Sequence, residues 1–80
     1  MKEQRRLKNE RKYKNWEELP TGGRRYWYDI VGRLGWISRY VKVVDDNENT
    51  TSFYQEVYDE NSKLIELHHK YPEDKGHQKV

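Results

Sequence analysis

Three side chains in the second half of the sequence could together perform acid–base chemistry: Glu56, Glu66 and His68. Metal-independent RNA cleavage needs a base for the 2′-hydroxyl proton, an acid for the leaving oxygen and a cation beside the phosphorane. Glu56 would be the base and His68 the acid. Lys42 or Arg39 would then stabilise the charge. A polar sheet face in contact with solvent would contain the same residue types, so both interpretations stay open.

Aromatic and basic residues are interleaved between residues 24 and 58, which suggests binding of single-stranded nucleic acid. Bases stack on aromatic and guanidinium planes, and cations hold the phosphates. The predicted nucleic-acid-binding residues are Arg24, Arg25, Arg33, Arg39, Lys42, Tyr40 and Tyr54. The alternative is that tyrosine and tryptophan form the core, because this chain has no alanine to pack there.

The formal net charge is only +2, but the charges are segregated along the chain. Residues 1–14 carry seven basic and two acidic side chains, and residues 22–44 carry five and one. Residues 45–66 carry seven acidic side chains and one lysine. This asymmetry favours an anionic partner, with RNA or a single strand as the leading hypothesis and the basic tail contributing contacts. A protein-interaction module that uses the acidic segment is a further alternative.

Several classes of protein are disfavoured by composition. The chain has no cysteine, which excludes a disulfide scaffold and thiolate zinc sites. His68 and His69 would point to opposite faces of a strand, so we expect no metal site and no cofactor. No run of about 18 apolar residues and no secretory signal pattern is present, so we expect no membrane span and a cytoplasmic protein.

The alternation of apolar and polar residues changes to a period of two at residue 24, which predicts an α+β fold that is mainly β. From residue 24 onward, segments rich in Tyr, Trp, Val and Ile alternate with short turns. Connections this short join antiparallel neighbours, so the prediction is a four-stranded antiparallel meander. The predicted strands are 24–31, 36–44, 52–59 and 64–71.

The flanking segments carry weaker signals. We expect residues 1–14 to be a basic tail that is disordered or a frayed helix, because they contain no apolar stripe. Residues 15–80 would form a single small domain. A short helical element is expected near residues 15–19, or a longer one that reaches back into the tail. The polar end, residues 73–80, is expected to be loose.

Alternation also predicts which residues share a face. Val41 is expected on the core side with Phe53 and Val57, whereas Glu56 and His68 are expected on the polar side. The few apolar side chains on the core side would leave a single open sheet only marginally stable, so we expect another element to pack on that side. A second copy would supply it as a homodimer, or Trp16 and Leu19 would fold back over it.

Several short blocks resemble small uncharacterised microbial domains. The resemblance covers residues 23–80 and carries over no catalytic or binding residue. The blocks are GGRRYW, GRLGW, RYVK, FYQEVYDE, LIELHHKYP and GHQKV.

Overall fold

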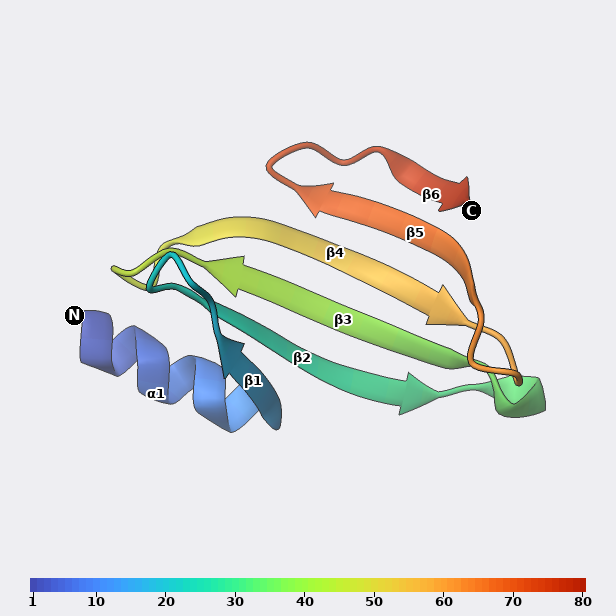
Figure 1. Ribbon diagram of the computed structural model, residues 1–80, viewed down its shortest axis with the longest axis horizontal. Helices are drawn as coiled ribbons and strands as arrows, with labels where there is room; N and C mark the ends of the chain where they lie inside the picture. Colours follow the sequence, from blue (N-terminus) through green and yellow to red (C-terminus); the bar gives the residue numbers. More distant parts are fainter.

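The computed structural model describes all 80 residues as one helix packed on a six-stranded antiparallel sheet (Figure 1). The strand order in the sheet equals the order in the chain, so each strand pairs with its sequence neighbour. The mainly β class and the antiparallel meander are thus confirmed. No helix is long and apolar enough to cross a membrane. The elements are α1 (Lys2–Lys12), β1 (Asn15–Glu18), β2 (Arg24–Val31), the 3₁₀ turn η1 (Arg33–Gly35), β3 (Ile37–Val44), β4 (Thr50–Tyr58), β5 (Leu64–Tyr71) and β6 (Gly76–Lys79).

The four predicted strands correspond to β2–β5, with ends that shift by at most two residues. The predicted number of strands is wrong, because two short edge strands flank these four. β6 forms where a loose terminus was expected, and it pairs His77 with His68 of β5. β1 forms where a helical turn was expected.

The hairpin between β1 and β2 explains why residues 15–19 are extended. Four residues gain little as an isolated helical turn, whereas pairing with β2 satisfies their backbone groups. The chain turns through Gly22, whose φ is +90°, and the amide of Leu19 donates to the carbonyl oxygen of Gly23 at 2.9 Å. A Cβ on Gly23 would lie 2.0 Å from the carbonyl oxygen of Val44, so this turn requires glycine.

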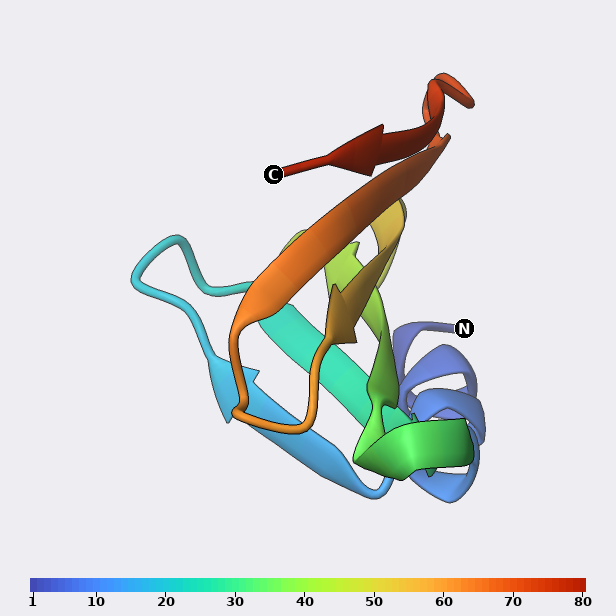
Figure 2. The same cartoon turned by 90° about the vertical axis from the view of Figure 1, so that its right-hand side faces the viewer.

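Helix α1 occupies the segment expected to be disordered or frayed, and it lies along one face of the twisted sheet (Figure 2). Its contacts with the sheet are largely polar and aromatic. At the end of the helix, the buried ring of Tyr13 packs against Tyr26 and Tyr28, with ring centroids 5.8 and 5.4 Å apart. We call this side of the sheet the helix face and the opposite side the open face.

A buried carboxylate joins the helix to the sheet. Glu48 lies in the β3–β4 turn with a φ of +66° and is 3% exposed. Its carboxylate accepts hydrogen bonds from Tyr26 Oη at 2.6 Å, Asn9 Nδ2 at 3.1 Å and Arg6 Nε at 3.4 Å. Burial raises the pKa of Glu48, but these donors outweigh it and hold the pKa below its ordinary value. Glu48 therefore stays ionised and connects α1, β2 and the turn.

The register of β4 differs from the predicted one. Lys42 is opposite Phe53 and Val41 is opposite Tyr54, with an irregularity between Val43 and Val44. Phe53 and Val57 therefore lie on the helix face with Lys42, and the expectation that they share the face of Val41 is wrong. Alternation of apolar and polar residues does not decide which face of β4 is buried, because aromatic residues occur at both odd and even positions of the strand.

We expect Tyr26→Phe to lower the free energy of unfolding by about 1.5–3 kcal/mol, since it removes a hydrogen bond to a charged, buried group. Urea unfolding at pH 7 measures this change. Tyr71→Phe is the matched control, because Tyr71 is 48% exposed. An equal loss in the two variants would contradict the role of the Glu48 network.

Candidate nucleic-acid interface

Arg24, a predicted nucleic-acid contact, is instead part of the fold. It is 6% exposed, and its guanidinium pairs with Glu10 at 2.7 Å and with Glu18 at 3.6 Å. The same guanidinium lies 3.7 Å from the centre of the Trp16 ring. These contacts connect α1, β1 and β2 and leave Arg24 without access to a ligand.

Two further predicted arginines are neutralised on the open face. Arg25 lies 3.4 Å from Glu56 and 3.4 Å from the hydroxyl of Tyr54, another predicted contact. Arg39 donates two hydrogen bonds to the carboxylate of Asp29, at 2.8 and 3.1 Å. An arginine whose charge is met by a carboxylate has less to offer a phosphate.

Arg33 is exposed in η1, at the opposite end of β2 and β3 from the helix (Figure 1). It is therefore separated from the basic residues of α1. The remaining predicted residues, Tyr40 and Lys42, both lie on the helix face.

The residues proposed for RNA cleavage are not brought together. Glu56 is opposite Leu67 in β5, whereas His68 is opposite Gln55, so Glu56 and His68 lie on different faces of the sheet. His68 Nε2 instead lies 2.7 Å from Asp74 Oδ1. Its Nδ1 is buried without a hydrogen-bond partner, so neither ring nitrogen faces Glu56.

On the helix face, the structure joins Lys42 and Tyr40 to residues that the sequence did not single out. The Lys70 ammonium lies 5.1 Å from the centre of the Tyr40 ring and 5.8 Å from that of Phe53. The Tyr40 ring stacks on Tyr28, with centroids 5.3 Å apart. Phe53 was not expected on this face because of the register of β4, and no local pattern distinguishes Lys70 from the other polar residues of β5.

Helix α1 adds a row of cations beside Lys42. Arg5, Lys8 and Lys12 are spaced three and four residues apart, which places them on one side of the helix. Lys42 Nζ donates to Asn9 Oδ1 at 3.0 Å, so its ammonium lies against the same side. We call this set the cationic face: Arg5, Lys8, Lys12, Lys42 and Lys70, together with the rings of Tyr40 and Phe53.

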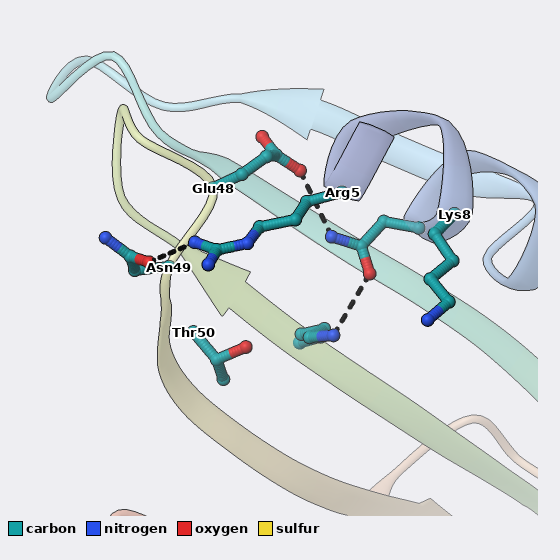
Figure 3. A pocket seen from close by; sticks show the side chains of 7 residues that line it. Arg5, Lys8, Glu48, Asn49 and Thr50 are labelled. Atoms are coloured by element: carbon teal, nitrogen blue, oxygen red, sulfur yellow. Dashed lines mark hydrogen bonds between the residues drawn. The ribbon is translucent and has the colours of Figure 1, made fainter. Parts of the chain in front are cut away.

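A polar pocket of about 290 Å³ opens between α1, β3 and the β3–β4 turn (Figure 3). We call it the α1–turn pocket. It has no apolar residue in its walls. Its lining consists of Arg5, Lys8, Asn9, Lys42, Glu48, Asn49 and Thr50.

The pKa of Lys42 lies below its ordinary value. Burial lowers the pKa, and the positive charges of Lys12 and Lys8 lower it further, while Glu48 acts in the opposite direction. Glu48 is already bonded to three donors of the fold. The surroundings of Lys42 therefore carry an excess of positive charge.

The acidic segment 45–66 is largely engaged in holding the sheet together. Asp45 and Asp59 accept backbone N–H groups in the two turns at 2.9–3.0 Å. Glu60 accepts a hydrogen bond from the indole of Trp36 at 2.7 Å. Nowhere in the chain do three or more metal-ligating side chains gather in a way that could hold an ion.

No protein-family model matches the chain, and neither a curated protein nor a solved structure was found to be similar to it. The geometry and charge of the cationic face are therefore the basis for its interpretation.

We expect the pKa of the Lys42 ammonium to lie below its ordinary value and to rise in Lys12→Gln, because that change removes a neighbouring positive charge. Titration followed by NMR of the lysine side chains measures both effects. Lys63→Gln, an exposed position in the β4–β5 turn, should leave the Lys42 pKa unchanged. An unshifted Lys42 in the native protein would contradict the inferred crowding of charge.

Proposed function

We propose that the protein binds RNA or another single-stranded nucleic acid on the cationic face. The observation that carries this proposal is that some basic side chains are paired with carboxylates, whereas those of the cationic face are not. Arg6, Arg24, Arg25 and Arg39 each lie within 4.0 Å of a carboxylate. None of the five cations of the cationic face forms such an ion pair, so their charges are available to phosphates.

The arrangement of these cations suits an extended strand. Lys70 on β5 and Lys42 on β3 lie on the same sheet face, with Tyr40 and Phe53 beside them. A base could stack on either ring if the Lys70 ammonium moved from the ring to an adjacent phosphate. Stacking of this kind tolerates any base, which favours binding with little sequence preference.

Binding to phosphates releases condensed counterions, so salt dependence is the direct test. Titration of labelled single-stranded RNA should give a slope of about −3.5 for log K against log salt, from five contacts at about −0.7 each. Lys70→Gln should reduce the slope by about 0.7. Lys63→Gln, with an exposed side chain outside the cationic face, should leave it unchanged. Absence of binding at about 50 mM salt, where phosphate contacts are strong, would reject the proposal.

The contribution of the rings is tested separately. Tyr40→Leu should weaken binding by about 1–3 kcal/mol, because it removes a stacking surface and keeps an apolar side chain. Tyr58→Leu, which changes a half-buried tyrosine of the open face, is the matched control. Thermal unfolding of both variants checks that the fold persists. If Tyr40→Leu binds like the native protein, the strand is held by phosphate contacts alone.

A further inference from the structure

The α1–turn pocket differs from the rest of the cationic face in its chemistry. The cationic face includes two aromatic rings, whereas the pocket has only polar and charged walls. A nucleobase finds no aromatic ring in these walls on which to stack. The pocket therefore suits a small and fully ionic group.

The pocket is rich in hydrogen-bond donors. The Lys8 ammonium makes no hydrogen bond to the protein, and the Lys42 ammonium uses only one of its three donors, on Asn9. Arg5 donates to Asn49 Oδ1 at 2.6 Å and keeps further N–H groups free. The hydroxyl of Thr50 lies in the same wall.

The one carboxylate in the lining does not oppose an anion strongly. The Glu48 side chain has no exposed surface, and its oxygens accept hydrogen bonds from Tyr26, Asn9 and Arg6. Three cations therefore face the pocket against a negative charge that the fold already compensates.

The position of the pocket relates it to the proposed strand. Lys42 belongs both to the pocket and to the cationic face. Helix α1, the β3–β4 turn with Asn49, and Thr50 at the start of β4 line the rest of the pocket (Figure 3). A strand that runs from Lys70 toward Lys42 would thus bring its end into the pocket.

We propose that the α1–turn pocket binds the dianionic phosphate of a phosphate monoester. A terminal phosphate carries a charge of about −1.5 to −2 at pH 7, more than an internal phosphodiester, and offers three acceptor oxygens. The source is either the end of a bound strand, which rests on the proposed function, or a small free monoester. Both sources present the same group to Arg5, Lys8 and Lys42.

The first experiment compares three oligonucleotides of one sequence, with a 5′-phosphate, with a 3′-phosphate or with hydroxyls at both ends. One phosphorylated form should bind about tenfold tighter than the hydroxyl form, the least that one additional charge-assisted hydrogen bond contributes. Arg5→Gln should bring this ratio close to one. Lys70→Gln should weaken all three oligonucleotides and keep the ratio. Equal binding of the three forms by the native protein would overturn a site for strand ends.

The second experiment titrates the ¹⁵N-labelled protein with inorganic phosphate and with a nucleoside monophosphate, and follows the amides of Asn49 and Thr50. Saturable shifts that disappear in Arg5→Gln support the pocket even if no oligonucleotide binds, and would identify a free monoester as the source. If oligonucleotides bind without end preference and these amides do not shift, the pocket proposal fails and the proposed function stands. If neither ligand binds, both fail.

Discussion

The buried negative charge of Glu48 is the constraint on which this structure depends. An ionised carboxylate without solvent is tolerated only when donors surround it, and here they come from α1 and β2. The helix has no apolar stripe that could attach it to the sheet, and its buried residue is the polar Asn9. Hydrogen bonding to Glu48, together with packing of Tyr13, therefore does for α1 what apolar burial does for most helices.

The same constraint produces the cationic face. Lys42 donates to Asn9 of the docked helix, and burial together with the positive charges of Lys12 and Lys8 lowers the pKa of Lys42. The types of cation divide accordingly. Arginine presents a planar fork that suits carboxylates and aromatic faces, and the ion pairs of this fold all use arginine or histidine. The lysines, together with Arg5, Arg11 and Arg33, form no ion pair.

The sequence is sufficient for β2–β5, because runs of aromatic and β-branched residues alternate with short polar turns. It is misleading at residues 15–18, where Asn15 followed three residues later by Glu18 matches a helix-capping pattern, although the backbone of these residues pairs with β2. The face of β4 is ambiguous for a physical reason, since Phe53 and Tyr54 are both aromatic neighbours on opposite faces. The docking of α1 depends on Glu48, which is 39 residues away from Asn9 in the chain, and no local pattern reports such a contact.

For the candidate site, the basic N-terminal segment was predictable as a segment, whereas the individual residues on the sheet were not. Whether a cation is free depends on which carboxylate the register places beside it. Arg39 lies opposite Asp29 in the β2–β3 pair and opposite Glu56 in the β3–β4 pair. Lys42 lies opposite Tyr26 and Phe53, neither of which carries a negative charge. A shift of one residue would place Arg39 opposite Tyr28 or Ile30 in the first pair, or opposite Gln55 or Val57 in the second, and so remove its carboxylate neighbour. Composition alone therefore cannot tell an ion-paired arginine from an unpaired lysine. In a chain with nearly balanced charges, the cations that stay unpaired are those that the register leaves without a neighbouring carboxylate.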